Sequence, residues 1–293
     1  MNVIQELVLP AGNEKPDFEH GSIFFVGTAT IIIRYAGFTI LTDPNFLHKG
    51  EQVHIGYGLR ATRLTDPAIN LENLPPIDLV VLSHMHEDHF DRVVQEKLDK
   101  TIPIVTTPQA AKFLKSKKFT SLYQLETWQT FYLAKGEAIL RLTAMPGKHG
   151  PGPLSNLLPS VMGSMLEFQT SSENTEFRIY ISGDTLVFRD LRKISQRFPE
   201  IHLALLHLGG TKIFGVMLTM DGQQGVEMIR IISPHSQTPN PLTVIPIHYN
   251  DYNVFKSSLD DFVRAFNASG LENQVHYLHH GETYTFEKAM SRA

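Results

Sequence analysis

Short apolar runs separated by turn residues dominate the first two thirds of the 293-residue chain. β-Branched and aromatic runs at 22–27, 30–36 and 38–44 predict strands joined by tight turns. Continuous apolar runs at 77–83 and 102–108 predict strands buried on both faces, because a half-exposed strand would alternate. More strand-rich stretches follow between residues 131 and 210. The pattern therefore predicts a protein built on extensive β-structure.

Helical spacing of apolar residues predicts short helices between and after these strands. Phe90, Val94 and Leu98 recur every four residues and predict a crossover helix over 90–100. Thr107 is a candidate helix cap, and Pro108 stands at the first helical position.

The last quarter of the chain predicts two longer helices and a hairpin. Asp221 is a candidate cap with Gln224 three residues later, a capping-box spacing, and Pro234 ends that helix. The second helix has one apolar face, which consists of Leu259, Phe262, Val263 and Phe266, and Gly270 ends it. The stretch 276–286 resembles a β-hairpin.

Strands with intervening helices indicate an α/β protein in which helices cover packed sheets. No fixed-period repeat and no Gly/Ser linker interrupts the chain, so we expect a single domain over 1–293. The stretch 45–76 has few strand or helix signals, and long loops of this kind usually carry function or move.

The composition of the chain restricts its possible partners and metal ligands more than it restricts its fold. With 26 basic and 30 acidic residues the net charge is −4, which gives no general attraction to nucleic acid or anionic membranes. No apolar run approaches the roughly 20 residues of a membrane span, and no secretory signal is visible, so the cytoplasm is the expected location. The chain has no cysteine, so any metal site must use His, Asp or Glu.

The stretch "SHMHEDHFD" at 83–91 follows the apolar run "IDLVVL" and concentrates the candidate chemistry. In a tight turn, His84, His86, Asp88 and His89 can converge on one or two points. Imidazole and carboxylate suit Zn²⁺ and also bind Mn²⁺ or Fe²⁺. Without a metal ion, clustered buried imidazoles and an unpaired Asp88 would be costly. The alternative is a polar strand end whose histidines face water.

Three separate strand ends add to this cluster. His149 lies in a Gly- and Pro-rich loop, Asp184 in "SGDT" and His248 in "PIHY". Taken alone, each residue is better explained by a structural role. Together with the first cluster they supply seven nitrogen or oxygen ligands, a number that suits two divalent ions sharing one carboxylate.

The order of these motifs resembles the metallo-β-lactamase superfamily. "TDP" at 42–44, "SHxHxDHxD", "SGDT" and "PIHY" are most similar to the branch that includes L-ascorbate 6-phosphate lactonase and N-acyl-phosphatidylethanolamine-hydrolysing phospholipase D. The resemblance implies a four-layer αββα sandwich with two metal ions at one edge of the sheets.

The resemblance also implies a role for each ligand. The first ion would be held by three histidines, His84, His86 and His149. The second ion would be held by Asp88, His89 and His248, with Asp184 bridging the two. Asp43 in "TDP" would hydrogen-bond a ligand imidazole and fix its tautomer, although an ordinary turn explains "TDP" equally well.

Departures from the superfamily's patterns favour a hydrolase. The absence of cysteine excludes the lactamases with a cysteine ligand, and His86 stands where oxygen-reducing diiron members have Glu. Ions about 3.5–4 Å apart can activate a bridging water, so we expect hydrolysis of a phosphodiester, lactone or carboxylic ester, with Asp88 and Asp184 catalytic. A ribonuclease Z-like phosphodiesterase is the alternative, but no Gly/Pro-rich RNA-binding arm is present. A non-catalytic metal protein is less favoured because no ligand is missing.

The substrate is expected to be a small or lipid-like ester rather than a nucleic acid. His207 follows a strand and is a candidate substrate contact, with a core position the equal alternative. The apolar stretches 152–166 and 213–218 predict either a pocket for an acyl chain or core packing. Arg60 and Arg63 could clamp a phosphate, although a solvated surface position is favoured for both. Homo-oligomers occur among similar proteins, and nothing in the sequence argues against one.

Overall fold

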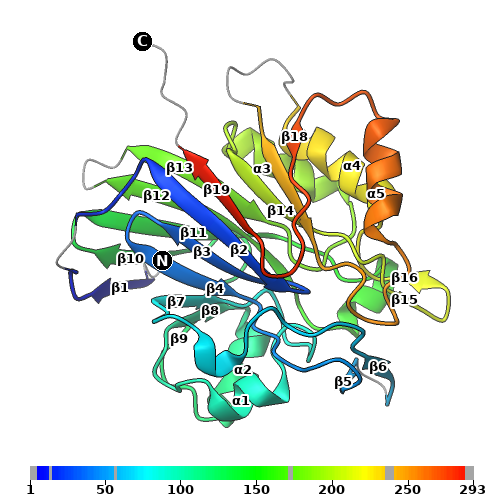
Figure 1. Ribbon diagram of the computed structural model, residues 1–293, viewed down its shortest axis with the longest axis horizontal. Coiled ribbons are helices and arrows are strands. Elements are labelled where there is room, and N and C mark those ends of the chain that lie inside the picture. The colour runs from blue at the N-terminus through cyan, green and yellow to red at the C-terminus, as the bar shows by residue number, and fades with distance from the viewer. Residues whose placement is uncertain (1–4, 13–14, 56–57, 171–173, 235–240, 288–293) are drawn as a thin grey trace.

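The computed structural model describes residues 5–12, 15–55, 58–170, 174–234 and 241–287, and within them the chain forms two large β-sheets (Figure 1). The larger sheet has eight strands in the order β1 (Gln5–Leu9), β10 (Thr130–Lys135), β11 (Ala138–Pro146), β12 (Met162–Thr170), β13 (Thr175–Ile181), β14 (Leu203–His207), β17 (Thr243–Ile247) and β18 (Gln274–Val275). The smaller has seven, in the order β19 (Thr283–Glu287), β2 (His20–Gly27), β3 (Thr30–Tyr35), β4 (Phe38–Thr42), β7 (Leu79–Val81), β8 (Ile104–Thr106) and β9 (Leu122–Gln124).

The remaining elements cover these sheets or connect their strands. Five α-helices are present in the described part: α1 (Arg92–Lys97), α2 (Pro108–Ser116), α3 (Arg192–Arg197), α4 (Gly222–Ile232) and α5 (Leu259–Asn267). Short 3₁₀ helices occupy η1 (Leu71–Asn73), η2 (Gly152–Asn156) and η3 (Arg189–Leu191). Two small ribbons pair β5 (Gln52–His54) with β6 (Arg60–Thr62) and β15 (Lys212–Ile213) with β16 (Val216–Met217). Every described helix is too short or too polar to traverse a lipid bilayer.

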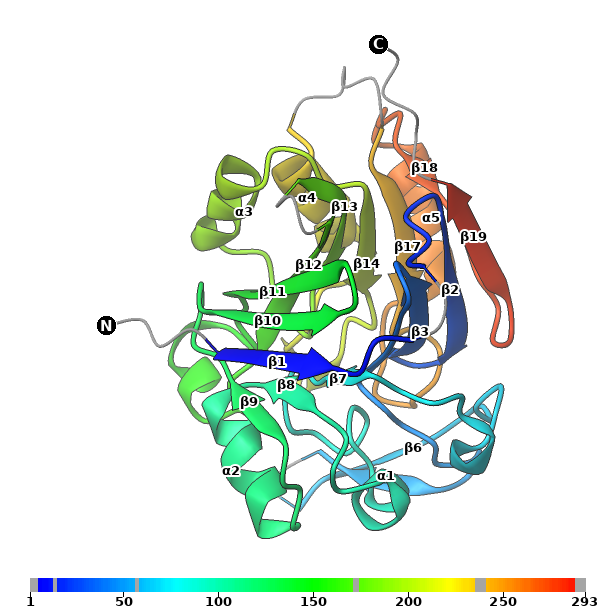
Figure 2. The same ribbon diagram turned by 90° about the vertical axis from the view of Figure 1, so that its left-hand side faces the viewer.

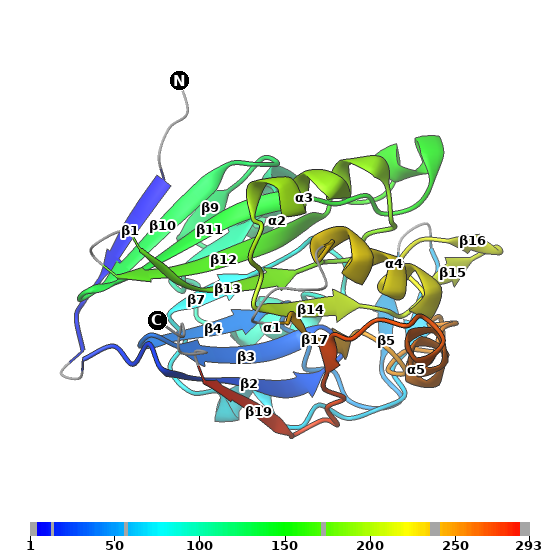
Figure 3. The ribbon, with the colours of Figure 1, turned by 90° about the horizontal axis from the view of Figure 1, so that it is seen from above.

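The hydrophobic core divides these elements into four layers. Between the sheets, the ring of Tyr35 meets that of Phe168 edge to face at 5.0 Å within a fully apolar cluster. Outside the eight-stranded sheet, α3, α4 and α5 bury residues such as Ile229 and Phe262 (Figure 3). Outside the seven-stranded sheet, α1 and α2 bury residues such as Leu114 (Figure 2). The predicted αββα sandwich is therefore confirmed.

Local sequence signals explain where the helices begin. Thr107 accepts a hydrogen bond from the Ala110 amide and caps α2, as predicted. Asp221 caps α4 through the Gln224 amide, but the predicted capping box is wrong because the Gln224 side chain instead accepts from the Val187 amide.

Two other sequence predictions need correction. The stretch 276–286 is not a hairpin, because β18 pairs with β17 in one sheet and β19 pairs with β2 in the other. The connection between them therefore crosses from sheet to sheet. The stretch 45–76 contains β5, β6 and η1 rather than a loop alone.

Candidate metal centre

The candidate ligands meet because each follows the carboxyl end of a strand that points toward the same edge of the sandwich. Strands β4 and β7 are parallel neighbours and lead to Asp43 and His84. Strands β13, β14 and β17 are also parallel, and β13 and β17 lead to Asp184 and His248. His149 follows β11, which is antiparallel to β12 and so runs in the direction of β13. Carboxyl ends of parallel strands are where α/β proteins build their sites.

The backbone at these strand ends adopts conformations that side chains usually avoid. Asp43 and His248 have positive φ values of 35° and 60°. Gly183 has φ 61°, and a Cβ there would lie 2.7 Å from the Met162 carbonyl oxygen. Strained residues of this kind cluster at functional sites, where the surrounding structure holds them.

The turn after β7 folds its histidines onto one side. The amides of His89 and Phe90 both donate to the His86 carbonyl, at 3.0 and 2.9 Å. Asp91 then caps α1 and also accepts from the Leu47 amide at 3.0 Å. These bonds hold the turn between α1 and the neighbouring loop. The ligand side chains on the turn therefore lose little conformational freedom when they bind a common ion.

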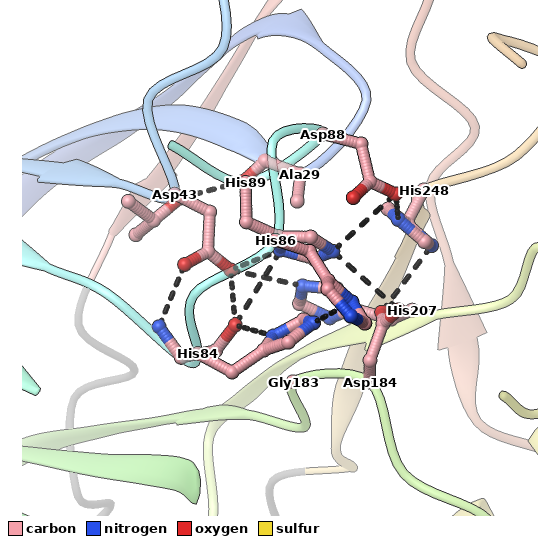
Figure 4. A network of polar contacts seen from close by, with 12 residues as sticks. Ala29, Asp43, His84, His86, Asp88, His89, Gly183, Asp184, His207 and His248 are labelled. Carbon is pink, nitrogen blue, oxygen red and sulfur yellow. Dashed lines mark hydrogen bonds and ion pairs between the residues drawn. The ribbon is translucent and has the colours of Figure 1, made fainter. Parts of the chain in front are cut away.

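Figure 4 shows the resulting cluster. Four sets of described residues each bring potential ligand atoms within 4.8 Å of one another: His84, His86 and His149; Asp88, His89 and His248; His84, His89 and Asp184; and Asp43, His89 and His207. Asp184 lies between the first two sets, with Oδ2 3.4 Å from His89 Nε2 and Oδ1 3.4 Å from His248 Nδ1. The structure thus brings all seven sequence-predicted ligands together.

Buried polar atoms that make no hydrogen bond indicate that the cluster fits a metal ion. In the described part of the chain, such atoms include Asp88 Oδ1, His89 Nε2, Asp184 Oδ1 and both ring nitrogens of His248. An unsatisfied buried polar atom costs about 1–3 kcal/mol, so several at one point call for a shared partner. A divalent cation satisfies imidazole and carboxylate lone pairs at once, and this donor set suits Zn²⁺, Mn²⁺ or Fe²⁺.

The pKa values of the clustered side chains favour protonation states that can bind a cation. Burial, assisted by His149, lowers the pKa of His86 to about 3, so its imidazole is neutral at pH 7. Burial opposes ionisation of Asp184, but His248 and His89 hold its pKa well below the usual value. Burial also disfavours charge on His89, yet Asp184 and Asp88 raise its pKa well above normal. A bound cation would take the place of that His89 proton.

Asp43 and Ser83 form a hydrogen-bonded junction behind the cluster. Asp43 Oδ1 accepts from the Ser83 amide at 2.7 Å, and Oδ2 accepts from the Ser83 hydroxyl at 2.8 Å and lies 3.1 Å from His89 Nδ1. The Ser83 oxygen also lies 3.0 Å from His84 Nδ1, and its only hydrogen goes to Asp43, so His84 donates to it. Both histidines therefore carry their proton on Nδ1 and turn Nε2 toward the cluster.

Two further histidines have Nδ1 within hydrogen-bond distance of a neighbour. His149 Nδ1 donates to the Leu218 carbonyl at 3.1 Å, next to the β15–β16 ribbon. His207 is fully buried, with Nδ1 3.1 Å from the Ser182 hydroxyl and Nε2 3.5 Å from Asp43 Oδ2. A role for His207 in substrate binding stays a prediction. Sequence reasoning missed the roles of Ser83 and Leu218, although a hydroxyl residue directly before a ligand was a usable signal.

Arg63 corrects another expectation. Its side chain is fully buried, not solvated, and donates to the Asn45 carbonyl at 3.1 Å and to the Thr65 carbonyl at 3.0 Å. Asn45 in turn donates to the Glu87 carbonyl at 2.9 Å. Arg63 therefore supports the ligand turn from behind.

Comparison with known proteins agrees with this geometry. The family described as "Beta-lactamase superfamily domain" matches residues 39–249, more than half of the chain. The chain belongs to this superfamily. The match begins in β4 and ends just after His248, so it includes every strand end that supplies the cluster.

The relatives of this chain include proteins named as hydrolases. The UPF0173 protein YddR of Bacillus subtilis is 27% identical over 269 residues, which cover 89% of this chain and 98% of that protein. A UPF0173 metal-dependent hydrolase of Nanoarchaeum equitans is 27% identical, over 71% of this chain and 86% of that protein. The mitochondrial N-acyl-phosphatidylethanolamine-hydrolyzing phospholipase D of Saccharomyces cerevisiae is 27% identical, over 71% of this chain and 44% of that protein. These findings assign the chain to the metal-dependent hydrolases.

Solved structures confirm the superfamily fold. A possible metal-dependent hydrolase from Veillonella parvula superposes with a TM-score of 0.71 at 22% identity, over 90% of this chain and 98% of that one. The isothiocyanate hydrolase from Delia radicum gut bacteria gives 0.73 at 22% identity, over 91% and 99%.

Proposed function

We propose that this protein is a dinuclear metal-dependent hydrolase of an ester-type bond in a phosphodiester, lactone or carboxylic ester. The observation that carries the proposal is the arrangement of two three-residue ligand sets with Asp184 between them. Zn²⁺ is the expected ion, with Mn²⁺ and Fe²⁺ as alternatives. Two divalent ions, when bound there, would lower the pKa of a water molecule and polarise the bond under attack.

The residues of the chain would position the two ions and provide the negative charge around them. His84, His86 and His149 would hold one ion, and Asp88, His89 and His248 the other. Asp184 contributes an ionised carboxylate that faces both sets. Asp88 keeps its pKa at about 2 because His89 and His248 outweigh its burial, so it can act as a ligand or accept a proton at Oδ1.

Metal content tests the dinuclear part of the proposal. Elemental analysis of protein purified with added Zn²⁺ should give two ions per chain, and Asp184→Asn should hold fewer. Asp190→Asn is a matched control, because Asp190 is exposed and forms an ion pair with Lys193 on the surface. A single ion per wild-type chain, or equal metal content in the wild type and Asp184→Asn, would contradict the assignment.

Turnover tests the reaction class. Metal-loaded protein is assayed with an aryl phosphodiester, an aryl carboxylic ester and a lactone. Hydrolysis of any of these that is lost in Asp184→Asn and kept in Asp190→Asn supports the proposal and identifies the bond. Metal-loaded protein that hydrolyses none of the three refutes it.

A further inference from the structure

The seven proposed ligands differ in their exposure to solvent. Among the seven proposed ligands, His86 is partly exposed, whereas the other six are buried. His86 is therefore the proposed ligand with the most contact with solvent. His86 also lines a groove of about 510 Å³, a size within the range of small-molecule sites.

The walls of this groove are mainly apolar and come from separate parts of the chain. Met85 precedes His86 in the ligand turn, Phe113 lies on α2, and Leu157 and Leu158 follow η2. Phe113 is 38% exposed and Leu157 65% exposed, among only seven large hydrophobic side chains that are exposed in the described part of the chain. Two such side chains in the lining of one groove, beside a proposed metal ligand, indicate an apolar ligand, because exposed apolar side chains that gather at one place often mark a binding site.

The charges in the groove exclude a polyanion as its occupant. Lys117 is the one lysine or arginine among the lining residues, and its Nζ lies over the Phe113 ring, 5.3 Å from the centre. Glu87 contributes a negative charge, and its Oε2 accepts from the His54 amide at 2.6 Å. A groove that binds single-stranded nucleic acid needs a basic track along the backbone, and here the two charges cancel.

We propose that this groove binds the uncharged acyl or alkyl chain of the substrate, with the scissile bond beside His86. The inference rests on the proposed function, because it takes the metal centre to act on an ester. The metal centre would supply the reaction, and Phe113 and Leu157 would select substrates by the length of their apolar chain.

Calorimetric binding of methyl-, butyl- and octylphosphonate to the metal-loaded protein tests this selection without turnover. We expect affinity to rise about fourfold for each methylene that enters the groove. Leu157→Glu and Phe113→Ser should each flatten this dependence. Val8→Glu is the matched control, because Val8 is 72% exposed on β1 and outside the groove, and it should keep the wild-type slope.

The outcomes separate this inference from the proposed function. Equal affinity for methyl- and octylphosphonate, or a slope that survives in both groove variants, overturns the groove assignment even if an ester is hydrolysed. A slope that is lost in Leu157→Glu and Phe113→Ser but kept in Val8→Glu supports the groove assignment, even if the esters tested above are not hydrolysed.

Discussion

Replacing Asp43 by asparagine should weaken one metal site without changing any proposed ligand. Both Asp43 oxygens act as acceptors, Oδ1 toward the Ser83 amide and Oδ2 toward the Ser83 hydroxyl and His89. An asparagine must place its NH₂ group at one of these positions. At Oδ1 it would oppose the Ser83 N–H, so we expect it at Oδ2, where it donates to His89 Nδ1. The His89 proton then moves to Nε2, which can no longer bind a metal ion.

Changes to residues that orient a metal ligand typically reduce affinity about 10- to 100-fold. This corresponds to about 1.4–2.8 kcal/mol of binding free energy. We expect Asp43→Asn to lose this much affinity for the ion held by Asp88, His89 and His248. The ion held by the three histidines should be less affected, because the Ser83 oxygen can still accept from His84.

Calorimetric titration of metal-free protein with Zn²⁺ in competition with a chelator measures both affinities. Asp66→Asn is the matched control, because Asp66 also lies 3.1 Å from a histidine Nδ1, that of His48, but on the surface. It should bind both ions as the wild type does. Wild-type affinities in Asp43→Asn would refute the tautomer argument, and a loss in both variants would show that the effect is not specific to the metal centre.

Three further predictions concern stability. Removing the ions with a chelator should lower the thermal midpoint, since one ion at 100 times its Kd contributes about 2.7 kcal/mol; unchanged calorimetric midpoints would argue against bound metal. Arg63→Met should cost about 1–3 kcal/mol in urea unfolding because it takes the Arg63 donor from the buried main-chain carbonyl of Asn45, whereas exposed Arg60→Met should stay within about 0.5 kcal/mol; equal losses would contradict this. Burial opposes ionisation of Asp251, but a hydrogen bond with His280 lowers its pKa below 3.8. Its charge therefore stabilises the fold above pH 3.8, and this stability is lost as the pH falls through the folded-state pKa. The destabilisation of Asp251→Asn should accordingly shrink between pH 6 and pH 3, and a constant difference would refute the assignment.

The features that were predictable from the sequence are those that are marked by residues close to them along the chain. A cap such as Thr107 needs only the residues that follow it, and a ligand at a strand end is marked by the apolar run before it. The four-layer architecture also followed from strand and helix signals, together with the superfamily resemblance. Such features depend on the order of residues along the chain rather than on distant partners.

The features that were not predictable depend on contacts between distant segments. The burial of Arg63 depends on carbonyl groups, which exist at every residue and leave no sequence signal. Likewise, the Leu218 carbonyl that holds His149 has no signature in its side chain. The hairpin prediction at 276–286 failed because Thr283 pairs with Phe24, some 260 positions earlier, instead of with the adjacent apolar run.

The cluster joins strand ends from both sheets, and this has a consequence for how the protein opens. His84 extends from the seven-stranded sheet, whereas Asp184 and His248 extend from the eight-stranded one, in a chain without a disulfide. Bound ions would therefore cross-link segments that are far apart in the sequence and lie in different sheets. Cross-links that close long loops reduce the entropy of the unfolded chain most, so the ions would stabilise the contact between the two sheets. Without them, amide hydrogen exchange should accelerate first at the ends of β7 and β17, while the middle of β12 stays protected. Metal loss would then let the two sheets separate first at the edge that carries the ligands.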